Sequence, residues 1–94
     1  MEDHGLTDEK WEAFGEYLKE NEYGAATIEK YLRELRGFKQ WLDGRTVSKE
    51  TAAEYKAHLQ KEGYAPVTVN AKLSALNVFF RFAGWEECRV RFLR

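Results

Sequence analysis

Apolar residues recur with the spacing of an α-helix in four stretches of the chain. The first covers residues 8–21, where Trp11, Phe14 and Leu18 follow one another at intervals of three and four. Thr7 stands immediately before it, and a threonine hydroxyl at this position accepts hydrogen bonds from the free N–H groups of a helix start. This stretch therefore predicts an amphipathic helix with a defined beginning.

A second helix is predicted over residues 26–42 and ends at Asp43-Gly44, a typical helix stop. Gly37 lies inside it, where glycine costs roughly 1 kcal/mol relative to alanine, which suggests close packing at that position. The apolar face of this helix again repeats at intervals of three and four residues. Its members are Ile28, Tyr31, Leu35, Phe38 and Leu42.

Residues 49–62 form the third predicted helix, with Ser48 as its cap, and residues 66–83 form the fourth, with Pro66 at its first position. Phe79 and Phe82 lie off the apolar face of the fourth helix, so they must pack sideways or meet a partner. The apolar face of the third helix is Ala52, Tyr55 and Leu59; that of the fourth is Val69, Leu73, Leu76, Phe80 and Ala83.

The remaining segments set the expected domain limits. Residues 1–7 are interpreted as a flexible end, residues 8–84 as the helical domain and residues 85–94 as the start of a linker that is cut short. No stretch alternates with period two long enough to predict a strand within the domain. The sequence therefore predicts an all-α fold, a compact four-helix bundle with short connections.

Composition narrows the class of protein. The chain has 94 residues, of which 44% are hydrophobic, and this is enough for one self-folding domain. A single cysteine excludes a disulfide framework and a cysteine-rich zinc site, and it fits a reducing compartment. No apolar run reaches the roughly 20 residues that a membrane span needs. We therefore expect a soluble, cytoplasmic protein.

The formal net charge of −1 conceals a gradient along the chain. Residues 1–24 contain eight acidic side chains and two lysines, whereas residues 66–84 contain Lys72, Arg81 and no acid. The negative charge of residues 1–24 therefore cancels a net positive charge on the rest of the chain. Such asymmetry favours a polyanionic partner.

The sequence offers no constellation for catalysis. It contains no HExxH motif, no paired Cys or His at metal-ligand spacing and no glycine-rich phosphate loop. His4, in the expected flexible end, and His58 are interpreted as surface residues, and Cys88 as an inert thiol. We therefore expect no catalytic residue, no metal and no cofactor.

A binding surface is the better hypothesis. On the fourth helix Asn70, Ser74, Asn77 and Arg81 share one face, and amide, hydroxyl and guanidinium groups suit phosphates and base edges. Thr68 and Lys72 lie on another flank near the helix start, where phosphate is favoured. The second helix offers a weaker row, diluted by carboxylates. That row is Thr27, Lys30, Arg33 and Arg36. An ordinary solvated face would show the same pattern.

These residues resemble a known family. The run Thr27-Ile28-Glu29-Lys30-Tyr31, with Leu35, Phe38 and Trp41-Leu42 after it, is similar to the first half of the core-binding domain of tyrosine recombinases, the phage-type integrases. The run from Val69 to Ala83 resembles the last helix of that domain. Val47-Ser48, Tyr55 and Leu59 also fit, so the resemblance covers roughly residues 8–94.

The resemblance implies a SAM-like helical bundle that clamps double-stranded DNA opposite a separate catalytic domain. It implies DNA contacts at Thr27, Lys30, Thr68, Asn70 and Lys72, to which the helical faces add Arg33, Ser74, Asn77 and Arg81. The catalytic tyrosine would lie outside this chain, which we expect to be a non-catalytic fragment, monomeric when isolated. Its other partners would be recombinase protomers, in a bacterial or phage-encoded protein associated with the nucleoid.

An alternative hypothesis is a helical protein–protein interaction module. Its contact surfaces would be the acidic first helix together with Phe79, Phe82 and Phe92-Leu93. An enzyme is the third and least supported class, because no candidate constellation is present.

Overall fold

The computed structural model describes residues 4–93. Within them it contains four α-helices and no strand, and a short 3-10 turn follows the last helix. These elements are α1 (Asp8–Glu20), α2 (Ala25–Leu42), α3 (Lys49–Lys61), α4 (Pro66–Ala83) and η1 (Glu86–Cys88). Each helix agrees with its predicted range to within one residue at either end. The all-α prediction is confirmed.

The helix starts of α1 and α3 follow the predicted chemistry. The Lys10 N–H donates to the Thr7 hydroxyl at 3.2 Å. At α3 the Thr51 N–H donates to the Ser48 hydroxyl at 3.1 Å, and the Ser48 N–H donates back to the Thr51 hydroxyl at 2.8 Å. This reciprocal pair is a capping box, which satisfies two backbone donors at once.

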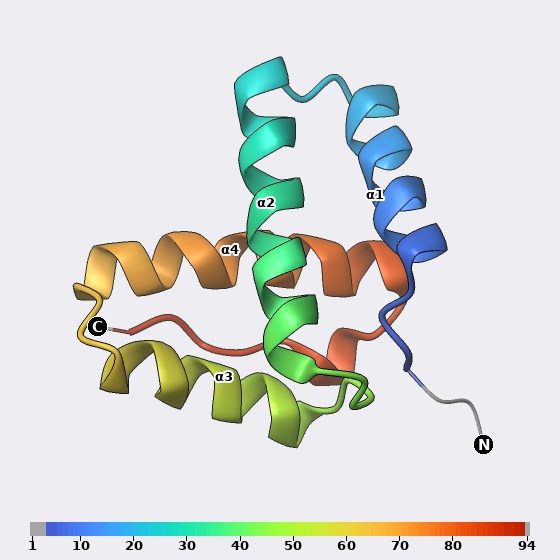
Figure 1. The fold of residues 1–94 in the computed structure, drawn as a ribbon. Helices are drawn as coiled ribbons and strands as arrows, with labels where there is room; N and C mark the ends of the chain where they lie inside the picture. Colours follow the sequence, from blue (N-terminus) through green and yellow to red (C-terminus); the bar gives the residue numbers. More distant parts are fainter. Residues whose placement is uncertain (1–3, 94) are drawn as a thin grey trace.

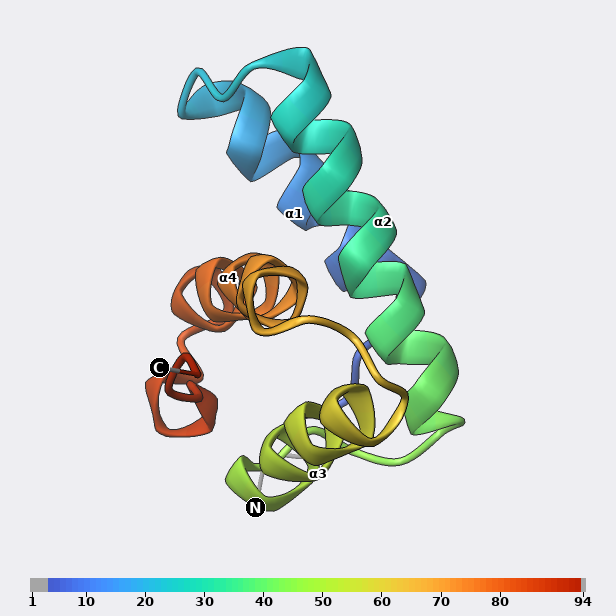
Figure 2. The same ribbon diagram turned by 90° about the vertical axis from the view of Figure 1, so that its left-hand side faces the viewer.

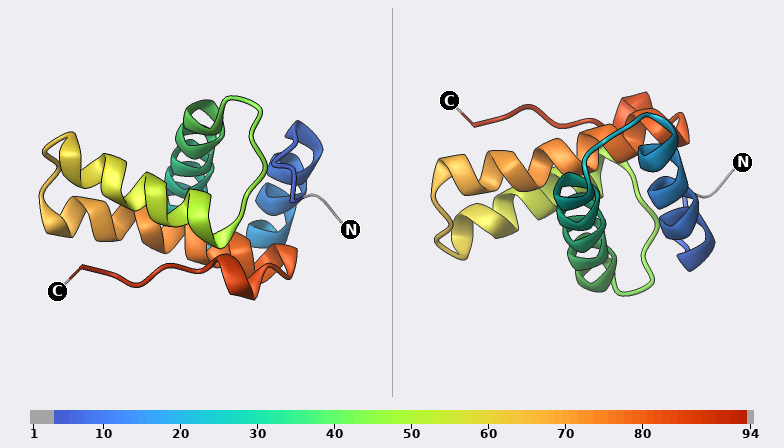
Figure 3. Two further views of the ribbon diagram at one scale, coloured as in Figure 1. Left: turned by 90° about the horizontal axis from the view of Figure 1, so that it is seen from below. Right: turned by 90° about the horizontal axis from the view of Figure 1, so that it is seen from above.

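The helices form two crossed pairs. The helices α1 and α2 run antiparallel, and this pair crosses α4 (Figure 1). The helices α3 and α4 lie side by side in opposite directions, and the chain beyond η1 returns along them (Figure 3). The first half of α2 projects past α4 (Figure 2). Ile28 and Tyr31 on that half are only partly buried, whereas Leu35 and Phe38 further along are fully buried.

The helix α4 supplies the centre of the core. Val69, Leu73, Leu76 and Phe80 are buried, as the apolar periodicity predicts. Phe79 is also fully buried, and it meets the Phe14 ring edge-on with centroids 5.3 Å apart. Phe82 packs at 4.8 Å from the Tyr17 ring. Both off-face phenylalanines thus pack sideways onto α1.

The packed unit is wider than the expected limits of 8–84. Leu6 lies in the core ahead of α1, and Trp85, Cys88 and Val90 lie in it after α4. The Val47 N–H donates to the His4 carbonyl at 2.7 Å, which ties the beginning of the chain to the loop before α3. The rest of the expected flexible end, residues 1–3, lies outside the described residues.

No helix among residues 4–93 is both long enough and apolar enough to cross a membrane.

Candidate nucleic-acid interface

An ion pair joins the two predicted binding rows at the crossing of α2 and α4. The Lys72 ammonium lies 3.1 Å from Glu34 Oε1 and 3.3 Å from Oε2. Thr27 and Lys30 precede Glu34 by seven and four residues, and Thr68 precedes Lys72 by four. At these spacings each residue shares a helix face with its paired neighbour. These residues therefore form one continuous surface, here called the junction surface. Its members are Thr27, Lys30 and the neighbouring Arg33 on α2, and Thr68 and Lys72 on α4.

The junction surface presents cations to solvent on its α2 side. Lys30 and Arg33 are exposed, while Thr27 and Thr68 are partly buried. The Arg33 guanidinium lies 3.8 Å from the Glu29 carboxylate, and both side chains are well exposed. An exposed pair of this kind is weak and is screened by salt. Both cations therefore remain available to an external anion.

The beginnings of α2 and α4 differ from those of α1 and α3. The helices α2 and α4 follow Gly24 and Ala65, with no capping side chain and no acid in the first turn. In contrast, α1 and α3 have Thr7 and Ser48 as caps and acidic residues in the first turn. Uncapped N–H groups at the positive end of a helix dipole attract anions. The two helices that form the junction surface are therefore the two whose starts suit phosphate.

Lys72 has a different environment from the one its sequence position suggests. Only 19% of its side chain and 15% of the Glu34 side chain are exposed, and its ammonium lies 5.1 Å from the centre of the Tyr64 ring. The positive charge of Lys72 is therefore neutralised by the Glu34 carboxylate. Beside this pair, burial raises the pKa of Tyr55 to about 12, with a further contribution from the charge of Glu34. Lys72 consequently holds α2 against α4.

Asn70 and Asn77 hold the chain that follows η1. Asn77 Nδ2 donates to the Val90 carbonyl at 2.9 Å, and the Val90 N–H donates to Asn77 Oδ1 at 3.0 Å. Asn70 makes the same two bonds with Leu93, at 2.9 and 2.7 Å. Asn77 is only 8% exposed. In this conformation the two amides bind main chain, and DNA contacts by Asn70 and Asn77 stay a prediction.

The spacing of these bonds fits an extended segment of chain that runs beside a helix. Seven helical residues rise about 10.5 Å, and three extended residues rise about 10 Å, so Asn70 and Asn77 match the main chain of Val90 and Leu93. Residues 89–93, here called the tail segment, are also held from α3. Lys49 donates to the Arg89 carbonyl, and Lys56 donates to the Arg91 carbonyl at 2.6 Å. The tail segment is thus fixed through its backbone by two helices.

The remaining predicted residues, Ser74 and Arg81, lie on the same face of α4 as the two asparagines. Arg81 is exposed and Ser74 is partly buried. No carboxylate among the described residues pairs with Arg81, so its charge faces solvent. The predicted residues therefore form two groups. Thr27, Lys30, Arg33, Thr68 and Lys72 belong to the junction surface, and Asn70, Ser74, Asn77 and Arg81 lie beside the tail segment.

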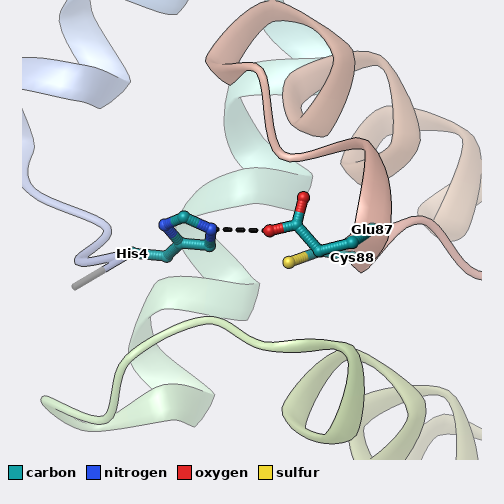
Figure 4. Close-up of side chains that lie close together, drawn as sticks. All are labelled: His4, Glu87 and Cys88. Atoms are coloured by element: carbon teal, nitrogen blue, oxygen red, sulfur yellow. Dashed lines mark hydrogen bonds and ion pairs between the residues drawn. The ribbon is translucent and has the colours of Figure 1, made fainter. Parts of the chain in front are cut away.

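His4 packs against Trp85, Glu87 and Cys88, and no pattern in the sequence predicts this cluster. His4 Nε2 lies 2.8 Å from Glu87 Oε2, and the hydrogen bond from His4 lowers the pKa of Glu87 (Figure 4). The His4 ring stacks on Trp85 with centroids 4.4 Å apart. Burial raises the pKa of the adjacent Cys88 thiol to about 11, so this thiol is protonated at neutral pH. His4 and Glu87 are 83 positions apart, and no local pattern connects them.

Comparison with known proteins decides the family. The family model described as the phage integrase N-terminal SAM-like domain matches residues 11–87. The chain belongs to this family. The tyrosine recombinase XerA of Thermococcus kodakarensis is 32% identical to it over 76 residues, which are 81% of this chain and 26% of the relative. The chain thus spans about a quarter of the length of that relative.

The resemblance drawn from the second and fourth helices is therefore confirmed at the level of the family. The matched range of this phage integrase SAM-like domain contains α2, α3 and α4 whole, most of α1, and both halves of the Glu34–Lys72 pair. It ends at Glu87, ahead of the tail segment.

Proposed function

We propose that this SAM-like domain binds duplex DNA through the junction surface, as the non-catalytic part of a site-specific tyrosine recombinase. The observation that carries the proposal is the Glu34–Lys72 pair, because it brings the polar rows of α2 and α4 together. The name of the relative, a tyrosine recombinase, supports the enzymatic context. In that context a catalytic domain with the nucleophilic tyrosine would act beside this one.

The chemistry of the junction surface suits the DNA backbone. Lys30 and Arg33 supply exposed positive charge, and phosphate oxygens are the groups that such side chains contact most often on DNA. The hydroxyls of Thr27 and Thr68 stand within the first turns of α2 and α4, where free N–H groups also donate to phosphate. Arg81 is exposed on the opposite face of α4, beside the tail segment, so we propose it as a phosphate contact separate from the junction surface. The domain would thereby clamp one side of the core site while the catalytic domain holds the other.

The acidic side chains of α1 define the face that DNA avoids. Glu9, Glu12, Glu16 and Glu20 are all exposed on α1, and Lys19 on the same helix is paired with Glu16 at 3.6 Å. Negative charge at this density repels phosphate. The proposal therefore orients the domain with α1 turned away from the duplex.

The test is a titration of a fluorescently labelled duplex, read by anisotropy at several salt concentrations. Lys30→Glu and Arg33→Glu should each weaken binding at low salt. Replacement by alanine should reduce the slope of log affinity against log salt by about 0.9 for each phosphate that the variant no longer neutralises. Lys19→Glu on α1 is the matched control, since it makes the same charge reversal at an exposed helix position on the acidic face.

Two results would contradict DNA binding by the junction surface. One is the absence of binding at the lowest salt concentration by a folded wild-type domain. The other is an equal loss of affinity in Lys19→Glu and Lys30→Glu, which would report net charge rather than a defined surface.

A second candidate function, protein binding, rests on a groove between α1 and α2. The groove has a volume of about 490 Å³, and Trp11, Ile28 and Leu32 are among the residues that line it. Glu9, Glu12, Glu16 and Lys19 also line it, and because the carboxylates outnumber the lysine it would accept a basic segment with apolar side chains, such as one from a neighbouring recombinase protomer. Amide shifts on adding a partner protein separate the two functions. Protein binding predicts changes in α1 and at Ile28 and Leu32, whereas DNA binding predicts changes at Lys30 and in the first turn of α4 without changes in α1.

A further inference from the structure

Three potential metal ligands from opposite ends of the chain meet at η1, which itself supplies two of them. They are the His4 imidazole, the Glu87 carboxylate and the Cys88 thiol, and their ligand atoms all lie within 4.8 Å of one another (Figure 4). Nitrogen, oxygen and sulfur donors of these types are the ligands that Zn²⁺ takes in proteins. The cluster lies away from the junction surface and has no part in the proposed DNA contacts.

The surroundings hold each donor in place. Hydrogen bonding of the His4 carbonyl to the Val47 N–H fixes the backbone of His4, and its stacking on Trp85, with 12° between the ring planes, fixes the imidazole. Cys88 is fully buried, and its N–H donates to the Trp85 carbonyl at 2.9 Å. Trp85 therefore supports two of the three donors. Outer contacts that orient ligands in this way are typical of metal sites.

We propose that His4, Glu87 and Cys88 bind one Zn²⁺ ion. The imidazole nitrogen, one carboxylate oxygen and the sulfur would occupy three positions of a tetrahedron, and water would occupy the fourth. Binding breaks the His4–Glu87 hydrogen bond, and the neutral imidazole changes tautomer, so that its proton moves from Nε2 to Nδ1 through solvent and Nε2 binds the ion. The Cys88 S–H bond also breaks. The thiol proton is released to solvent, and no oxidation or reduction takes place.

The position of the cluster gives such a site a structural consequence. His4 stands before α1, whereas Glu87 and Cys88 stand directly before the tail segment. A bound ion would connect the beginning of the chain to the segment through which it leaves α4. Zn²⁺ would therefore stabilise the packing of the tail segment, an effect independent of whether the domain binds DNA.

The experiment uses the reduced 94-residue chain without an affinity tag, titrated with zinc chloride in competition with a chromophoric chelator. We expect saturation at one ion per chain. Titration with Co²⁺ should produce the charge-transfer absorption of a cobalt–thiolate bond together with the visible bands of a tetrahedral site. His4→Ala, Glu87→Gln and Cys88→Ser should each reduce Zn²⁺ affinity by about tenfold or more, and Cys88→Ser should abolish the charge-transfer band.

Matched controls separate this site from general metal binding. His58→Ala removes the other histidine of the chain, and Glu86→Gln removes the carboxylate next to the cluster; both should bind Zn²⁺ as the wild type does. Because Cys88 is buried, circular dichroism must show that Cys88→Ser is folded, and His4→Ala, at a partly exposed position, carries the test if it is not. Absence of stoichiometric binding, or wild-type affinity in His4→Ala, would overturn the proposal.

Discussion

The Lys72 ammonium donates to both oxygens of the Glu34 carboxylate, at 3.1 and 3.3 Å, and this contact joins α4 to α2 across 38 positions of sequence. Removal of one partner leaves the other charge poorly solvated. We expect Lys72→Met to lower the free energy of unfolding by about 1–3 kcal/mol, measured by urea denaturation. The double variant Glu34→Gln with Lys72→Met should recover part of that loss. Strictly additive losses would show that the two side chains do not interact.

Asn77 should contribute more to stability than Asn70. Asn77→Ala leaves a buried N–H and a buried carbonyl of Val90 without partners, which costs about 1–3 kcal/mol per group. Asn70 is less buried, so water can replace its side chain after mutation. Hydrogen exchange should show the Val90 amide losing protection in Asn77→Ala. Ser74→Ala on the same face of α4 is the control, and an equal effect there would contradict the assignment.

Two glycines should respond to alanine in opposite ways. A Cβ at Gly37 would lie 3.8 Å from the Tyr55 hydroxyl, an ordinary contact, so Gly37→Ala should stabilise α2 by up to about 1 kcal/mol. Gly84 ends α4 with a φ of 77°, where a side chain is strained, and Gly84→Ala should destabilise the domain. Thermal denaturation of the two variants should show a higher melting temperature for Gly37→Ala and a lower one for Gly84→Ala. A lower melting temperature for Gly37→Ala would show that the packing around Gly37 is tighter than its 3.8 Å distance from Tyr55 indicates.

Stability should fall as the pH rises from 10 toward 12. Burial raises the pKa of Tyr55 from 10.0 to about 12, so in this range the folded phenol keeps a proton that the unfolded phenol has released. The folded state then binds more protons, and its stability decreases with increasing pH. Urea denaturation across the range should show a smaller decrease in Tyr55→Phe. An identical decrease in the two proteins would exclude Tyr55 as a cause.

The helices could be predicted because their signals are local. The stripe from Val69 to Phe80 and the caps Thr7 and Ser48 act over distances of three or four residues, which the sequence displays directly. The rows on α2 and α4 could be found in the same way. Whether these residues come together depends on how α2 and α4 cross, and the apolar periodicity of the sequence does not predict that crossing.

The contacts of the tail segment could not be predicted for the same reason. The sequence around Asn77 is the same whether its side chain binds DNA or the backbone of Val90, so the pattern does not distinguish the two partners. The sequence places His4 in a flexible end because its partners Trp85 and Glu87 lie at the opposite end of the chain. The partner of each of these side chains is set by contacts between residues that are distant in the sequence.

The hydrogen bonds that hold the tail segment affect which substitutions it can accept. Asn70, Asn77, Lys49 and Lys56 all engage backbone atoms, which every amino acid provides. Arg91 and Phe92 are exposed to solvent, so substitutions there alter the surface chemistry without redirecting the chain. The two asparagines and two lysines thus set the path of the chain away from α4, and the side chains at positions 91 and 92 are free to serve the surface.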